Sequence, residues 1–184
     1  MNLLPAALLV LCLACGKTPS EEFVLPVKPN PEEKPKEDLT RIKVMSFNCL
    51  TVDEETAAAD EKWAVRKPAQ IKMFKDVFPD LAGLQECQLA AAAVEEEIPE
   101  YGVFKAPYSE ALGSASLGPI ILYKKSRVTV LDSGHFWLGE TPDVPCKPFG
   151  ASDTHYRIAT WIECLVKGCQ DTTPISLISP RTIR

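Results

Sequence analysis

Hydrophobic and polar residues alternate along Arg41–Leu50, which is the pattern of a β-strand with one buried face. In Trp63–Val77 the apolar residues recur at helical spacing, and Pro68 is expected in the first turn of this helix, where proline is tolerated. The apolar run Leu81–Glu86 predicts a second strand, and Leu89–Ile98 predicts a second helix, which ends at the following proline. The periodic part of the chain therefore opens in the order β-α-β-α.

Further strands are predicted beyond the second helix. They are Tyr101–Lys105, Ile120–Tyr123, a strand within Val128–Trp137, and Arg157–Val166. Strands that first alternate with helices and then follow one another predict an α/β sandwich with mixed sheets. Neither a Gly-rich phosphate-binding loop nor a GxSxG nucleophile motif accompanies these elements in the sequence.

The N-terminal region has a different composition. Met1–Ala14 is almost wholly apolar, too short to cross a bilayer, and typical of the hydrophobic part of a signal peptide. Residues 16–40 are rich in Pro, Glu and Lys, a composition typical of a flexible tether. We therefore predict an export signal over residues 1–15, a tether over residues 16–40, and a folded domain over residues 41–171.

The end of the apolar segment, Leu13-Ala14-Cys15, resembles the lipobox of bacterial lipoproteins. In that family the signal is cut before the cysteine and the new N-terminus is acylated. The resemblance implies that Cys15 is lipidated and that the protein is anchored to a membrane of the bacterial cell envelope. The segment before it has no Lys or Arg, and Cys12 occupies a position where an aliphatic residue is usual. A plain secretory signal, with a secreted or periplasmic product, is the alternative.

The net charge of −5 gives the chain no bulk electrostatic attraction to nucleic acid, so no specific nucleic-acid partner is indicated. Its seven cysteines form no CxxC pair in the body of the chain, and no histidine lies at zinc-ligand spacing from a cysteine pair. We interpret them as buried or ordinary thiols. A Cys164–Cys169 disulfide is the alternative in an oxidising compartment.

Three segments in order resemble the endonuclease/exonuclease/phosphatase family. The first is Lys43-Val-Met-Ser-Phe-Asn48, and the second is Phe78-Pro-Asp-Leu-Ala-Gly-Leu-Gln-Glu86, with a helix carrying Trp63 and Arg66 between them. The third comprises Ile120–Lys125, Leu131–Pro142 and Arg157–Trp161. The resemblance implies a four-layer α/β sandwich and the divalent-metal-dependent hydrolysis of phosphodiester or phosphomonoester bonds.

The same resemblance implies roles for individual residues. In the family, the asparagine that ends the first strand and the glutamate that ends the second lie at the metal site, which places Asn48 and Glu86 there. Mg²⁺ or Mn²⁺ is the expected cofactor, since hard cations prefer oxygen ligands, and a phosphate ester is the expected substrate. Tyr123 and Arg157 are candidate substrate-site residues. The alternatives are packing for Tyr123 and an ion pair for Arg157.

The family's remaining catalytic strings, Asn-Thr-His, Gly-Asp-Phe-Asn and Ser-Asp-His, do not occur in this sequence. His135 and His155 match none of them and are interpreted as non-catalytic. Residues 172–184 are interpreted as a divergent or frameshifted tail, so the second half of the fold is expected to be missing. We expect one sheet with helices on one face and an unpartnered apolar face on the other. The main hypothesis is then an incomplete or inactive hydrolase, and the alternative is a non-enzymatic surface lipoprotein or binding remnant.

Overall fold

The computed structural model describes residues 9–14, 39–52, 54–106, 118–148, 156–169 and 174–180. In chain order the elements are β1 (Leu9–Ala14), β2 (Arg41–Asn48), α1 (Trp63–Val77), β3 (Leu81–Gln85), α2 (Gln88–Glu97), β4 (Tyr101–Lys105), β5 (Ile120–Lys124), β6 (Val128–Trp137), β7 (Ile158–Val166) and β8 (Ile175–Pro180). From β2 to β7 the predicted order of helices and strands is confirmed, with boundaries that differ by at most a few residues.

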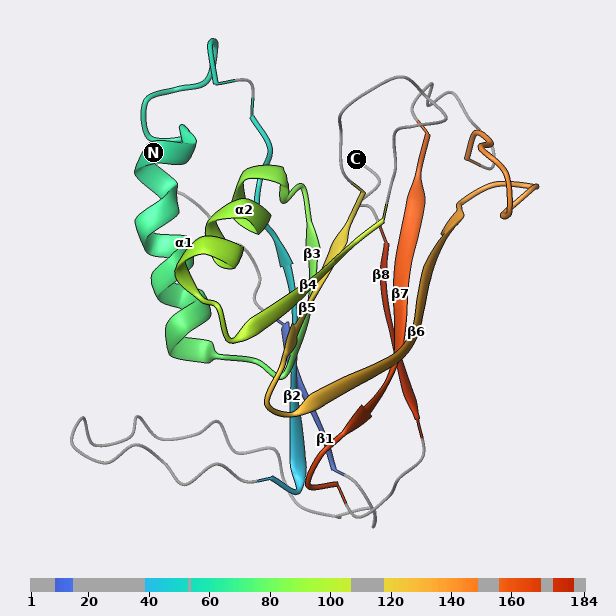
Figure 1. Ribbon diagram of the computed structural model, residues 1–184. Helices are drawn as coiled ribbons and strands as arrows, with labels where there is room; N and C mark the ends of the chain where they lie inside the picture. Colours follow the sequence, from blue (N-terminus) through green and yellow to red (C-terminus); the bar gives the residue numbers. More distant parts are fainter. Residues whose placement is uncertain are drawn as a thin grey trace, which may run out of the picture.

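The strands form two sheets, a five-stranded sheet in the order β1-β2-β3-β5-β4 and a three-stranded sheet in the order β6-β7-β8. The larger sheet is mixed, because β2 and β3 are parallel while β5 is antiparallel to both β3 and β4. Helices α1 and α2 cover one face of this sheet, and the smaller, antiparallel sheet lies on the other side (Figure 1). The fold is therefore α/β, with layers in the order helices, mixed sheet, antiparallel sheet.

The second face of the larger sheet has a partner, which corrects the expectation that it would have none. Leu81 and Ile121 of the larger sheet are buried in one cluster with Ile162 and Cys164 of β7. The error came from assigning all the strands to one sheet. The turn at residues 125–127 separates β5 from β6, and β6 pairs with β7 instead of with β4 or β5.

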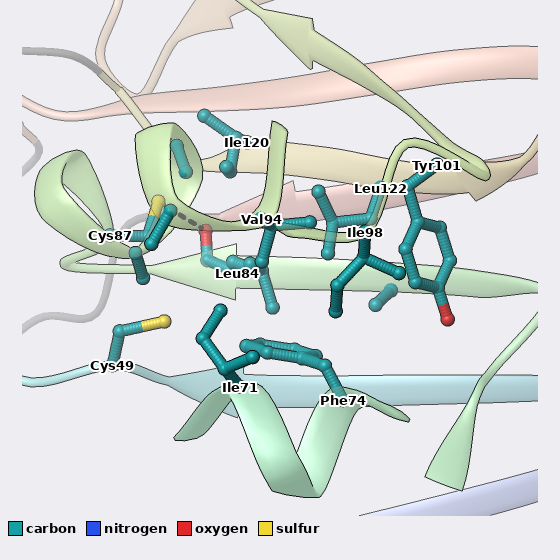
Figure 2. Close-up of a cluster of buried hydrophobic side chains, with 14 of the residues drawn as sticks. Cys49, Ile71, Phe74, Leu84, Cys87, Val94, Ile98, Tyr101, Ile120 and Leu122 are labelled. Carbon is teal, nitrogen blue, oxygen red and sulfur yellow. Dashed lines mark hydrogen bonds between the residues drawn. The ribbon is translucent and has the colours of Figure 1, made fainter. Parts of the chain in front are cut away.

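The helical layer packs through small and aromatic residues. Ile71 and Phe74, one helical turn apart on α1, point at the sheet and are buried together with Leu84 of β3 (Figure 2). On α2, the buried residues include Ala90 and Ala91, whose small side chains let this helix approach the sheet closely. Among the helices that the structure describes, none is long and apolar enough to cross a bilayer.

The ends of α1 depend on residues outside its own sequence pattern. Glu54, in the preceding loop, accepts hydrogen bonds from the Trp63 N–H at 3.0 and 3.2 Å, so a carboxylate satisfies the positive N-terminus of the helix. Phe78 ends the helix in the left-handed conformation, with φ of 43°. Pro68 is the sixth helical residue, not a first-turn residue as expected, so α1 tolerates a proline without the N–H that would bond to Ala64.

Two strands were not predicted. Ile175–Pro180 lies in the predicted divergent tail and forms β8, which pairs with β7 in antiparallel register. Leu9–Ala14 lies in the predicted signal peptide and forms β1, which pairs with β2. The interpretation of residues 1–15 as a cleaved signal stays a prediction. Residues 1–8 and 15–38, which are the rest of that signal and most of the predicted tether, lie outside the described residues.

A buried cluster of charges joins the strands at the end of the sandwich where β2 and β3 begin. Asp80 lies between Lys124 and Arg127, each 3.3 Å away, and the three residues are only 3–4% exposed. Arg127 also donates to the backbone carbonyls of Leu39, Arg41 and Lys167. A single carboxylate thus balances part of the charge of two cations, and backbone carbonyls satisfy most of the remaining guanidinium donors.

Removing the Asp80 charge should destabilise the fold strongly. Asp80→Asn removes the carboxylate that lies 3.3 Å from both Lys124 and Arg127, and breaking a buried ion pair in this way typically costs about 3–5 kcal/mol. We expect a large fall in the urea midpoint of unfolding followed by circular dichroism. The matched control is Asp76→Asn, since Asp76 pairs with Lys72 on the exposed face of α1 and should change stability by less than about 0.5 kcal/mol. Equal effects of the two substitutions would contradict a structural role for Asp80.

Candidate functional site

The candidate site lies where β2 and β3 end. Asn48 is the last residue of β2, and Glu86 follows the last residue of β3. The two strands are parallel neighbours, and their register places Asn48 beside Gln85. Parallel strands end at the same edge of a sheet, which is where open α/β sheets bind ligands. The two residues predicted to share a site are therefore side by side.

Hydrogen bonds fix the Glu86 carboxylate on both oxygens. Asn48 Nδ2 donates to Glu86 Oε1 at 3.1 Å, and the Thr51 N–H donates to Glu86 Oε2 at 3.1 Å. The Asn48 side-chain oxygen accepts from the Leu50 N–H at 2.8 Å. The nitrogen of the Asn48 amide is thus bonded to Glu86, and its oxygen is bonded to the Leu50 backbone. Glu86 itself has a φ of 50°, a conformation that costs a non-glycine residue roughly 1–2 kcal/mol.

The turn that follows Asn48 is fastened to helix α1. Arg66 donates from Nη1 to the Cys49 carbonyl at 2.6 Å and from Nη2 to the Leu50 carbonyl at 2.9 Å. Gln70, one helical turn later, donates to the same Cys49 carbonyl at 2.9 Å. The role of these side chains was missed in the sequence, although the position of Arg66 three residues after Trp63 placed it on a defined face of the helix.

A small cavity of about 30 Å³ borders this turn. It is lined by Cys49, Leu50, Thr51, Val52, Glu54, Trp63, Arg66, Glu86, Gln88, Leu89 and Ala90. Its volume suits a water molecule or a single small ion and is far below that of a pocket for an organic substrate. At its rim the Thr51 hydroxyl donates to Gln88 Oε1 at 3.0 Å.

The donor chemistry of this edge fits a hard cation. Glu86 supplies an anionic oxygen ligand on a half-buried carboxylate, and Mg²⁺ is commonly held by one or two carboxylates while it keeps several waters. In the described part of the chain, no group of three or more His, Cys, Asp or Glu side chains could hold a metal. One carboxylate with an amide beside it is compatible with a hard cation that keeps most of its water ligands.

Arg157 lies at the same end of the sandwich as Glu86. It directly precedes β7, whose Thr160 pairs with Ser179 of β8, and Ser179 in turn contacts Gln85 beside Glu86. The beginning of β7 and the ends of β2 and β3 all point toward the upper end of the molecule in Figure 1. Arg157 is half-buried at this end of the sandwich. Its predicted role at a substrate site stays a prediction, and this position is compatible with it.

Tyr123 lies elsewhere. Its register partner on β3 is Leu81, at the opposite end of that strand from Glu86, and its side chain packs against the core between the sheets. These surroundings match the alternative in which Tyr123 is a packing residue. His135 is on β6, where its ring meets Trp137 edge-on at 6.3 Å. His155 and Cys15 lie outside the described residues.

Two buried thiols lie directly behind the site. Cys49 and Cys87, which follow Asn48 and Glu86, face the helical layer (Figure 2). Burial raises the pKa of Cys87 to about 12, and burial together with the nearby Cys87 raises the pKa of Cys49 far above its usual range. Cys164 is a free thiol in the core between the sheets, with its pKa raised by burial to about 11, so the alternative of a Cys164–Cys169 disulfide is not realised in the structure.

Comparison with solved structures returns the fold seen here. An endonuclease/exonuclease/phosphatase family protein from Bacteroides thetaiotaomicron is 27% identical over 73% of this chain and 46% of its own, with a TM-score of 0.62. A second, from Bacteroides vulgatus, is 25% identical over 76% of this chain and 51% of its own, with a TM-score of 0.61. A mannosyl-6-phosphatase from B. thetaiotaomicron is 27% identical over 73% of this chain and 49% of its own, also at 0.61.

No protein-family model and no curated protein matches the sequence. The solved structures nevertheless confirm the resemblance that the sequence motifs indicated. The described elements have the fold of part of the endonuclease/exonuclease/phosphatase domain seen in these structures. The chain spans about half the length of these structures.

The two thiols behind the site should resist alkylation in the folded chain. With a pKa of about 12, Cys87 is a thiolate in roughly one molecule in ten thousand at pH 8. We expect iodoacetamide to modify the half-buried Cys146 at least about tenfold faster than Cys49 or Cys87, as followed by peptide mass spectrometry. In a denaturant the three rates should converge. Rapid modification of Cys87 under native conditions would contradict its burial.

Proposed function

We propose that this chain carries part of the metal site of a divalent-metal-dependent phosphoester hydrolase, with Glu86 as the metal ligand and Asn48 as the residue that orients it. The observation that carries the proposal is the 3.1 Å hydrogen bond between Asn48 and Glu86 at the shared edge of β2 and β3. Hydrogen-bonded partners of this kind fix the direction of a ligating carboxylate and raise metal affinity.

A bound Mg²⁺ or Mn²⁺ would supply neutralisation of charge on a phosphate oxygen. The protein's own contribution is to hold the Glu86 carboxylate in one orientation, through Asn48 on one oxygen and the Thr51 N–H on the other. Arg157, at the same end of the sandwich, is the side chain of this half that would pair with a substrate phosphate, because a guanidinium matches phosphate geometry.

We propose a phosphate ester as the substrate. The similarity to a mannosyl-6-phosphatase favours a phosphomonoester of a small molecule, and the net charge of −5 gives no support to a long nucleic acid. The strings that carry the family's general base do not occur in these residues. We therefore expect hydrolysis by this chain to be below detection, and divalent-metal binding is the function to test in it directly.

Metal binding should depend on both members of the pair. We expect Mn²⁺ titration, followed by the electron paramagnetic resonance of free Mn²⁺, to show one site whose affinity falls by about 10–100-fold in Asn48→Ala and by more in Glu86→Gln. Glu96→Gln, on the exposed surface of α2, is the matched control and should bind as the unsubstituted chain does. Absence of Mn²⁺ binding to the folded, unsubstituted chain would favour the alternative of a non-enzymatic lipoprotein.

We further propose that Cys15 is lipidated and anchors the protein to a membrane of the cell envelope. The proposal rests on the Leu-Ala-Cys sequence and on the polar segment of residues 16–40, which would hold the domain away from the lipid surface. Cleavage before Cys15 would also remove β1, so β2 would become the edge strand of the larger sheet.

The anchor can be tested in a bacterium that processes lipoproteins. The unsubstituted chain should incorporate radiolabelled palmitate and sediment with membranes, whereas Cys15→Ala should do neither, because the acylated residue is gone. Cys12→Ala is the matched control and should keep the label. Palmitate incorporation that survives Cys15→Ala would contradict the assignment, and a soluble, cleaved, unlabelled product would favour the plain secretory signal.

A further inference from the structure

We propose that Arg66 is a positioning residue for the Glu86 site, which acts through the backbone of the turn at residues 49–51. The inference rests on the proposed metal-binding role of Glu86 and adds to it a residue on a different element of the fold. Arg66 is on α1, and its hydrogen bonds at the site go to the backbone of the turn, not to the Glu86 carboxylate.

The guanidinium holds the turn at several points. Its Nη1 and Nη2 donate to the consecutive carbonyls of Cys49 and Leu50, and its Nε donates to the carbonyl of Glu61, two residues before α1 begins. A planar guanidinium with fixed donor directions can satisfy three carbonyls at once, whereas an ammonium group cannot reproduce this geometry. Gln70 adds a second donor to the Cys49 carbonyl.

The conformation that these bonds hold is an uncommon one. Leu50 has a φ of 63°, in the left-handed region that a non-glycine residue rarely adopts. Such a conformation persists where its surroundings determine it fully. Arg66 donates to the carbonyl of Leu50 and to that of the preceding residue, Cys49. A side chain of α1 therefore fixes the peptide groups on both sides of the strained Leu50.

The turn also directs two backbone N–H groups toward the Asn48 and Glu86 side chains. The Leu50 N–H donates to Asn48 Oδ1 at 2.8 Å, and the Thr51 N–H donates to Glu86 Oε2 at 3.1 Å. The first bond orients the amide that holds Glu86, and the second holds Glu86 directly. A relaxed turn would release both, so Arg66 controls the direction of the carboxylate without touching it.

Arg66 is itself held in place. Its guanidinium carbon lies 5.7 Å from the centre of the Trp63 ring, a cation–π contact, and the Trp63 N–H is bonded to Glu54. The side chain is half-buried and lines the same cavity as Glu86. None of these contacts involves the Glu86 carboxylate, so the guanidinium is placed to position the turn independently of it.

The test compares Arg66→Lys and Arg66→Met with Lys67→Met, a control on the next residue of the same helix, whose ion pair with Glu97 is on the surface. Hydrogen exchange of the Leu50 and Thr51 amides, measured by NMR without metal, is the first readout. We expect exchange at both amides to accelerate by at least about tenfold in the two Arg66 variants and to stay unchanged in Lys67→Met. Mn²⁺ affinity is the second readout, with an expected loss of about tenfold.

Two further measurements separate positioning from general stability. Exchange at core amides such as those of Leu84 and Leu122 should be unaffected if the fold persists, and added guanidinium ion should restore slow exchange at Leu50 and Thr51 in Arg66→Ala. If an Arg66 variant does not fold, Gln70→Leu removes one bond to the same turn and should give a smaller acceleration in the same two amides.

The outcomes are distinct. Unchanged exchange at Leu50 and Thr51 in folded Arg66 variants would overturn the inference, as would a uniform acceleration at every amide. If the unsubstituted chain binds no Mn²⁺, the proposed function fails, yet the exchange comparison still decides whether Arg66 orders the turn. If Mn²⁺ binds and its affinity does not change in Arg66→Met, the turn does not position Glu86 and the inference is wrong.

Discussion

The register between β2 and β3 is the constraint on which the rest of the structure depends, and Asp80 sets it. The Asp80 N–H donates to the Lys43 carbonyl at 2.8 Å, while the Lys43 N–H donates to Asp80 Oδ2 at 2.9 Å. The same carboxylate is buried against Lys124 and Arg127, so it cannot shift along the strand without leaving a charge unpaired. Five residues further on, this register brings Asn48 level with Gln85 and within reach of Glu86. A slip of one residue would turn every side chain of β2 to the opposite face and separate the pair.

The two ends of these strands are built for different purposes. At the Asp80 end, charges are buried and bonded to one another and to backbone carbonyls, which gives stability. At the Glu86 end, Leu50 and Glu86 both have positive φ, and hydrogen bonds from α1 hold the turn that contains Leu50. Strained backbone of this kind is typical of sites whose geometry serves binding. The buried charges at the Asp80 end thus fix the register of β2 and β3, and the strained residues at the Glu86 end depend on that register.

Much of this arrangement was predictable from the sequence, and the reasons for the exceptions are physical. The helix Trp63–Val77 was predicted with its observed bounds because apolar spacing is a local property. The β8 strand was missed because Pro174 precedes it, Pro180 is its last residue, and it forms by pairing with β7. The Asn48–Glu86 pair was predicted through family resemblance, whereas the roles of Arg66 and Gln70 were not, since their bonds are to backbone carbonyls and leave no pattern in the sequence.

The placement of β8 also bears on the site. Ser179 of β8 is buried against Gly83 so closely that a Cβ at Gly83 would lie 2.9 Å from its hydroxyl oxygen, and Gln85 bonds to that hydroxyl at 3.2 Å. The smaller sheet is therefore fastened to β3 only one residue before Glu86. A displacement of β8 would be transmitted to Gln85 through this bond, while Arg66 would still hold the other side of the site from α1. The neighbours of Glu86 are thus held from both faces of the larger sheet, and surroundings of this kind are what a residue with left-handed backbone geometry requires.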